Sequence, residues 1–103
     1  MVVLSRFEDH DGFDGVMLGH PNAEWHLEFT RQHEHAAGRA PTQDRLLVFY
    51  LPDRTTWEHG IQRMRDPGHV PVPSCNPFWD RAGTTFEDPD GYRVILQNAS
   101  WAK

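Results

Sequence analysis

The stretch from Thr84 to Leu96 constrains the fold of this chain more than any other. It begins with β-branched and aromatic residues, which favour an extended strand. Asp88-Pro89-Asp90-Gly91 follows and has the composition of a tight turn, because proline presets φ, aspartate bonds the local backbone and glycine accepts a positive φ. Tyr92 to Leu96 then forms a second apolar run. The stretch therefore predicts a β-hairpin.

The remaining segments predict a mixture of strands and one helix. Clean alternation over residues 24–31 places Trp25, Leu27 and Phe29 on one face of a strand. Thr55 and Glu58 have the spacing of a capping box, which predicts a helix that begins near Asp53 and ends at Asp66-Pro67-Gly68. Further strands are expected at residues 2–8, 13–18 with a bulge at Gly15, 44–51 and, as an edge strand limited by prolines, 70–73.

Composition narrows the class of protein. The 103 residues predict a single domain, and a net charge of −5 argues against a nucleic-acid partner. No apolar run approaches the roughly 20 residues of a membrane-spanning helix, so no membrane partner is expected. The one cysteine, Cys75, fits a reducing cytoplasm and is expected to be an inert packing thiol. Seven histidines make metal binding worth testing.

The hairpin also carries a resemblance. The run F-E-D-P-D-G followed by an apolar strand, with Asn76-Pro77-Phe78-Trp79-Asp80-Arg81-Ala82-Gly83 before it, is similar to the closing hairpin of the vicinal oxygen chelate superfamily. That superfamily includes glyoxalase I, bleomycin-resistance proteins and extradiol dioxygenases. The resemblance implies an α+β fold of paired β-α-β-β-β modules in one domain. Residues 44–103 match a complete second module, residues 32–43 a connector, and residues 1–31 a first module that lacks its opening strand and helix.

The resemblance also sets an expectation about metal. Members that use a divalent ion take ligands from the first and last strands of each module. Glu28 stands at one such position and is the only, weak candidate, whereas Ile95 stands where the last strand would carry a carboxylate and residues 44–51 contain no histidine. We therefore expect no metal and no cofactor. His26 and Glu28 are instead expected to form a hydrogen-bonding pair or to face solvent, and His33 and His35 to lie in a solvated connector.

Strand alternation predicts the residues of a ligand cleft between the modules. Val94 and Leu96 should pack against the helix, so that the intervening side chains of the last strand face the concave side. Phe78 and Trp79 belong to a loop that the resemblance places at the cleft mouth, although ordinary packing is equally expected of them. The predicted ligand-binding residues are His26, Glu28, Phe78, Trp79, Arg93, Ile95 and Gln97.

These expectations favour one function over two others. The leading interpretation is metal-independent binding of a small organic molecule, similar to the bleomycin-resistance branch. The alternatives are a metal-dependent lyase, isomerase or dioxygenase of the glyoxalase type, and an interaction protein that acts only in assembly. A meander without its opening strand and helix would leave an open edge and expose Trp25, Leu27 and Phe29. We therefore expect a homodimer whose partner covers that face or pairs that edge.

Overall fold

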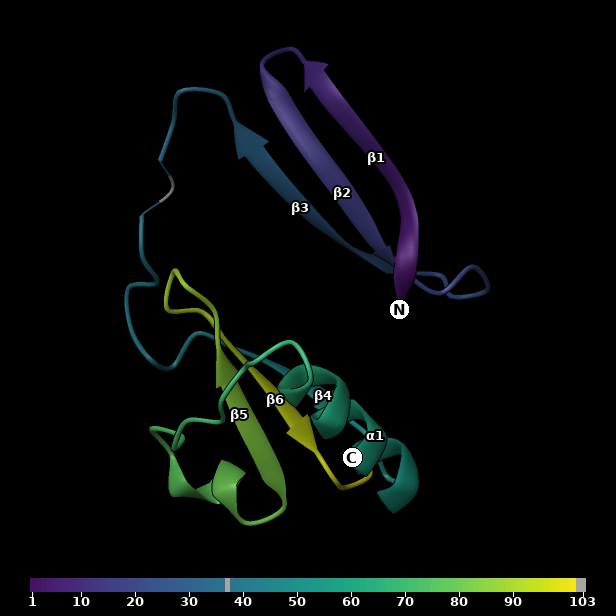
Figure 1. Cartoon of the computed structure of the whole chain (residues 1–103), viewed down its shortest axis with the longest axis vertical. Coiled ribbons are helices and arrows are strands. Elements are labelled where there is room, and N and C mark those ends of the chain that lie inside the picture. The colour runs from purple at the N-terminus through teal and green to yellow at the C-terminus, as the bar shows by residue number, and fades with distance from the viewer. Residues whose placement is uncertain (37, 102–103) are drawn as a thin grey trace. The chain divides into compact units, whose positions relative to one another are not determined.

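The computed structural model describes residues 1–36 and 38–101, and it divides the chain into two compact units, Met1–Gly38 and Arg39–Lys103. Each unit is built on a three-stranded sheet, and the second also contains an α-helix (Figure 1). The expected α+β class is confirmed. No helix in the described part of the chain is long and apolar enough to cross a membrane.

Unit 1 is the predicted meander. Strands β1 (Val2–His10), β2 (Phe13–Gly19) and β3 (His26–Gln32) are antiparallel and ordered β1-β2-β3. Gly12 closes the β1–β2 turn with a positive φ of 85°, which a residue without a side chain adopts freely. β3 begins at His26, so Trp25 precedes the strand instead of lying within it as predicted.

The bulge expected at Gly15 is wrong. Gly15 pairs regularly with both Phe7 and Thr30, and the irregularities lie on β1, between Val3 and Ser5 and between Phe7 and His10. A Cβ at Gly15 would collide with the ring of Phe7. Glycine is present here because an aromatic ring lies across the strand, which is the other common reason for glycine in a sheet.

Unit 2 joins a helix to a mixed sheet. The elements are β4 (Leu46–Tyr50), α1 (Arg54–Arg65), the 3₁₀ turn η1 (Pro77–Asp80), β5 (Gly83–Glu87) and β6 (Arg93–Gln97). The sheet order is β4-β6-β5, with β4 parallel and β5 antiparallel to β6. The edge strand predicted at residues 70–73 is reduced to a single bridge between Val72 and Thr85. The prolines on either side of Val72 remove the donors that would extend this bridge into a strand.

Helix α1 begins with a different cap from the predicted one. Asp53 is the N-cap, and its carboxylate accepts hydrogen bonds from the backbone N and the hydroxyl of Thr56, both at 2.8 Å. These bonds, the backbone one first, lower the pKa of Asp53. Thr55 therefore does not cap the helix, and Glu58 pairs with Arg54 at 3.0 Å. Both boundaries of the helix still match the prediction within a residue.

Part of the core of unit 2 lies between α1 and β6. Trp57 donates its indole N–H to the carbonyl of Leu96 at 2.8 Å, and Gly60 lies where a Cβ would be 3.5 Å from the Leu96 side chain. Leu96 therefore faces the helix, as predicted. Among the described residues, the buried hydrophobic side chains are Phe86, Leu96 and, on the face of the sheet opposite α1, Ile95; burial of each contributes about 1.5–3 kcal/mol.

Candidate functional site

The predicted turn forms and sets the register of the candidate site. Asp88 Oδ1 accepts from the backbone N of Asp90 and of Tyr92, both at 2.9 Å, and Gly91 has a φ of 86°. The register that follows pairs Glu87 with Arg93. Because alternate residues of a strand share a face, this register decides which side chains of β6 turn away from α1.

Three of the predicted site residues share the face of the sheet opposite the helix. Arg93, Ile95 and Gln97 alternate with Leu96, and Thr85 is the cross-strand partner of Ile95. All three are buried, with exposed fractions of 7%, 0% and 5%. We call these three residues with Thr85 the β6 face. The side chains of the β6 face are therefore shielded from solvent.

Arg93 connects the sheet to the loop that precedes η1. Its Nε donates to Glu87 Oε1 at 3.2 Å, and its Nη1 donates to the carbonyl of Pro73 at 3.0 Å. The guanidinium thus joins the sheet to the loop before η1. A buried charge held by a carboxylate and a carbonyl is stabilising only as a set, since removal of one partner leaves the others unpaired.

Polar atoms without partners mark the same region. Thr85 Oγ1, Gln97 Oε1 and Ser74 Oγ are buried and have no hydrogen-bond partner among the described residues. Gln97 Oε1 and the carbonyl of Trp79 occupy the space that a Cβ on Gly83 would fill. A buried polar group without a partner is unfavourable by about 1–3 kcal/mol.

Phe78 and Trp79 lie on η1, beside the start of β5. Asn76 caps this turn by accepting from the backbone N of Phe78 at 3.0 Å, and the two aromatic rings meet edge to face with centroids 5.1 Å apart. The carboxylate of Asp80 accepts from the backbone N of Ser74 and closes the loop. Phe78 is exposed and Trp79 is half-buried. Cys75, on the same loop, is exposed, so the packing role predicted for it is wrong.

A small hollow adjoins η1 on its α1 side. Its volume is about 250 Å³, and it is lined by Arg54, Trp57, Asp80, Arg81, Ala82, Gly83 and Asn98. Arg54 stacks on Trp57 with its guanidinium carbon 5.4 Å from the ring centroid, and Arg81 lies 5.9 Å from the ring of Phe78. Both guanidinium groups therefore already contact an aromatic ring.

The remaining predicted pair lies in unit 1. His26 Nε2 and Glu28 Oε1 are 3.3 Å apart on β3, and both side chains are about half exposed. The structure thus brings His26 to Glu28 on one unit and groups Arg93, Ile95 and Gln97 on the other. Whether any of them binds a ligand stays a prediction.

Sequence reasoning missed a charged cluster in unit 1. The carboxylate of Asp14 accepts from the backbone N of Asp9 at 2.9 Å, from His33 Nε2 at 2.8 Å and from Arg31 Nη2 at 3.0 Å. These bonds, that of Asp9 first and that of His33 second, lower the pKa of Asp14 to about 2 from its ordinary 3.8. Only the pairing of Asp14 with Arg31 across β2 and β3 could have revealed the cluster.

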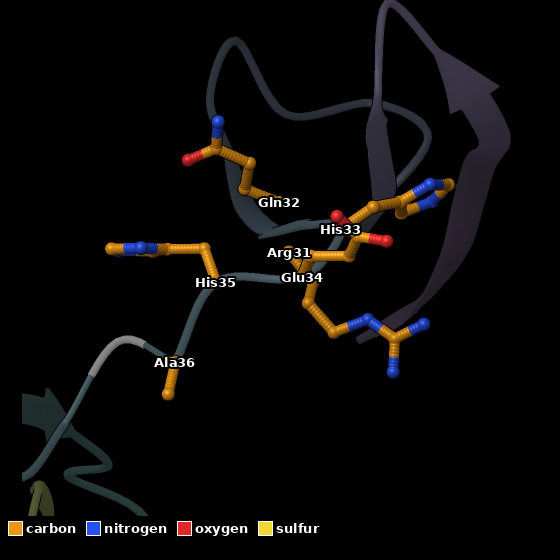
Figure 2. Close-up of a pocket in the computed structure, with 6 residues that line it drawn as sticks. All are labelled: Arg31, Gln32, His33, Glu34, His35 and Ala36. Carbon is orange, nitrogen blue, oxygen red and sulfur yellow. The ribbon is translucent and has the colours of Figure 1, made fainter.

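Figure 2 shows the open hollow next to this cluster. It has a volume of about 610 Å³ and is lined by Arg31, Gln32, His33, Glu34, His35 and Ala36. The rings of His33 and His35 point in opposite directions, because His33 turns toward Asp14 while His35 turns away (Figure 2). The two histidines thus do not converge on one position.

The described residues differ from the ligand set that the resemblance to the superfamily implies for a metal-dependent member. Ile95 offers only an alkyl group at a ligand position, and it is fully buried. In residues 1–36 and 38–101, no three His, Cys, Asp or Glu side chains gather closely enough to hold a metal ion. No reaction step through a metal follows from these residues.

Comparisons with known proteins identify the family. Residues 1–30 match the YycE-like N-terminal domain and residues 44–98 match the YycE-like C-terminal domain. The YycE protein of Bacillus subtilis is 40% identical over 96 residues, which are 93% of this chain and 69% of that protein. Its crystal structure superposes with a TM-score of 0.86 at 38% identity, covering 98% of this chain and 74% of that chain.

A more distant structure shows the fold alone. The trypanothione-dependent glyoxalase I of Leishmania major has a TM-score of 0.65 at 19% identity, covering 94% of this chain and 68% of that chain. Both solved structures support the resemblance drawn from the closing hairpin. The chain belongs to the YycE-like family and is structurally similar to the glyoxalase/fosfomycin resistance proteins of the vicinal oxygen chelate superfamily.

Proposed function

We propose that this protein binds a small organic molecule without a metal, and that the ligand completes the hydrogen bonds of the β6 face. The observation that carries the proposal is the pair of buried oxygens without a partner among the described residues: Thr85 Oγ1, across from Ile95 on β5, and Gln97 Oε1, two residues beyond Ile95 on β6. Ile95 supplies an apolar floor between them. Such a mixture of apolar surface and a few polar groups is typical of small-molecule sites.

Access to this face requires movement of the η1 loop. The loop is held by Asp80 at the backbone of Ser74 and by Arg93 at the carbonyl of Pro73. Phe78 is exposed at its surface and supplies an aromatic contact for an arriving ligand. In this proposal the η1 loop opens, the ligand bonds to Gln97 and Thr85, and Trp79 reports the event through its fluorescence.

We propose that the chain follows the paired β-α-β-β-β plan with a first module that lacks its opening strand and helix. The order β4, α1, the Val72 bridge, β5 and β6 supports a complete second module. The three antiparallel strands of unit 1 correspond to the last three strands of such a module.

The metal-dependent alternative rests on the relatives. The YycE protein is described as a protein of unknown function and a candidate glyoxalase/fosfomycin resistance protein. Ile95 and the absence of a histidine from residues 44–51 weigh against metal chemistry in this chain. Glu28, paired with His26, is the one carboxylate that such a site would use.

A ligand screen with matched variants tests the proposal. The purified chain is titrated with a library of small polar organic compounds, and binding is followed by tryptophan fluorescence. The Gln97→Met variant keeps the side-chain length but removes the acceptor, and we expect it to weaken binding at least tenfold, about 1.4 kcal/mol. Gln62→Met is the control, because Gln62 bonds to Asp66 on an exposed face of α1.

Two results would overturn the proposal. The first is equal affinity of the parent and Gln97→Met for every compound that binds. The second is a binding site that needs added Zn²⁺, Ni²⁺ or Fe²⁺ and is lost in Glu28→Ala, which would favour the metal-dependent alternative. A His26→Ala variant measured in the same titrations decides whether the pair on β3 contributes to binding.

A further inference from the structure

The hollow lined by α1 and the start of β5 takes no part in the proposed function. Its volume is about 250 Å³, and it shares no residue with the β6 face. Two arginines, Arg54 and Arg81, contribute guanidinium groups to its lining, and Asp80 contributes the one carboxylate. Ala82 and Gly83 have little or no side chain, which leaves space beside the charged groups. A hollow lined mostly by positive charge favours an anionic ligand.

Aromatic stacking and one ion pair hold Arg54 in place. Its guanidinium carbon lies 5.4 Å from the ring centroid of Trp57, and Trp57 is itself held by its indole N–H, which donates to the carbonyl of Leu96 at 2.8 Å. Glu58 accepts from Nε of Arg54 at 3.0 Å. This ion pair leaves the two terminal nitrogens of the guanidinium, Nη1 and Nη2, for another acceptor.

Arg81 is the less engaged of the two arginines. Its guanidinium carbon lies 5.9 Å from the ring centroid of Phe78, and in the described part of the chain no ion pair joins it to a carboxylate. Asp80 precedes it, but both oxygens of that carboxylate accept from the backbone N of Ser74, at 3.2 and 3.3 Å. A guanidinium presents five N–H donors in a planar fork. Arg81 therefore has donors available to an anion in the hollow.

Asn98 links the two segments that carry these arginines. Its side-chain Nδ2 donates to the carbonyls of Leu51 and Pro52, at 3.0 and 3.2 Å, just before α1. Its backbone N donates to the carbonyl of Ala82 at 2.7 Å, just before β5. The frame of the hollow is thus formed by bonds within the chain, and a ligand would not have to order it.

We propose that this hollow binds a phosphate group, either as free phosphate or as the phosphate of a small monoester. Such a group carries a charge of about −1.5 to −2 at neutral pH and has three acceptor oxygens, so two guanidinium groups can bind it together. A carboxylate has a single charge and two oxygens, which one guanidinium fork satisfies. The presence of two arginines in one hollow therefore selects phosphate over carboxylate.

Amide NMR of the full chain, at constant ionic strength, tests the site. Inorganic phosphate should cause saturable shifts at the amides of Ala82, Gly83 and Asn98, and acetate should bind about tenfold more weakly or not at all. Arg81→Gln should weaken phosphate binding about tenfold, because it removes charge-assisted hydrogen bonds. Arg63→Gln is the matched control: it removes the same charge from the last turn of α1, outside the hollow, and should leave the affinity unchanged.

A second variant and a second ligand sharpen the test. Arg54→Gln should weaken phosphate binding by a factor similar to that of Arg81→Gln. Four results would each overturn the proposal: no saturable shift, acetate affinity equal to that of phosphate, unchanged affinity in either variant, or the same weakening in Arg63→Gln. Glycerol 3-phosphate distinguishes the two sources, since tighter binding than inorganic phosphate identifies a monoester and weaker binding identifies the free ion. Gln97→Met should bind phosphate as the parent does, so the result is independent of the proposed function.

Discussion

The two units use the same alternation of apolar and polar residues and reach different degrees of burial. In unit 2, α1 covers one face of the sheet and the segment around η1 contacts β5, and Ile95 is fully buried. In unit 1, no described residue forms a helix, and Trp25 and Phe29 are 53% and 54% exposed. An apolar strand face becomes buried only where another element covers it, and in unit 2 that element is α1 or the segment around η1.

The largest expected effect compares a core position of each unit. Ile95→Ala should lower the free energy of unfolding by about 3–4 kcal/mol, because it removes buried methyl groups and leaves a cavity. Phe29→Ala removes a larger side chain, yet it should lower the free energy of unfolding by less than about 1 kcal/mol at protein concentrations where the chain is monomeric. Urea unfolding measures both. Equal losses would mean that the face of unit 1 is covered and the comparison fails.

The next effect concerns the charge that ties the η1 loop to the sheet. Arg93→Ala should lower the free energy of unfolding by about 3 kcal/mol, because it leaves Glu87 and the carbonyl of Pro73 without their donor. The double variant Arg93→Met with Glu87→Leu should regain most of this loss, since no buried charge then lacks a partner. An unchanged melting temperature in Arg93→Ala would show that the loop is held by other contacts.

Strand alternation alone predicted Arg93 to be a ligand-binding residue, whereas its hydrogen bonds also give it a structural role. Alternation correctly places Arg93, Ile95 and Gln97 on the face opposite α1, and turn chemistry correctly places Asp88 and Gly91. Neither pattern reveals that Arg93 reaches Pro73, because that contact depends on a loop 20 residues away in the sequence. Local rules thus predicted strands, turns and faces, whereas burial and partners required tertiary structure.

The errors have the same origin. A capping box at Thr55 was predicted, but the N-cap is Asp53, whose carboxylate accepts two hydrogen bonds from Thr56. The bulge expected at Gly15 was in fact space for the ring of Phe7 on a neighbouring strand. The cluster at Asp14 escaped notice because its members come from β1, β2, β3 and the residue after β3. In each case a partner distant in sequence, or a second local option, decided the outcome.

A smaller effect tests the assignment of the cap. Asp53→Ala should lower the melting temperature and reduce the helical signal in circular dichroism, because the first turn of α1 loses the acceptor for the Thr56 N–H. Thr55→Ala should leave both unchanged, since Thr55 caps nothing. The reverse order of effects would restore the capping box as the helix start.

The smallest expected effect is the pH dependence of unit 1. The pKa of Asp14 is about 2 in the folded chain and 3.8 in its ordinary state, so the ionised carboxylate favours the folded form. The resulting stability is present above pH 3.8 and is lost as the pH falls from 3.8 toward 2. Because Asp14 lies at the surface, added salt should weaken the effect.

Resonances of residues around Asp14, followed by NMR as the pH is lowered, should shift in the parent with a midpoint near the lowered pKa of about 2. Asp14→Asn should abolish the transition, and His33→Gln should raise its midpoint, since one of the bonds that lower the pKa is weakened. A midpoint near 3.8 in the parent would mean that the hydrogen bonds of Asp14 to Asp9, His33 and Arg31 do not persist in solution.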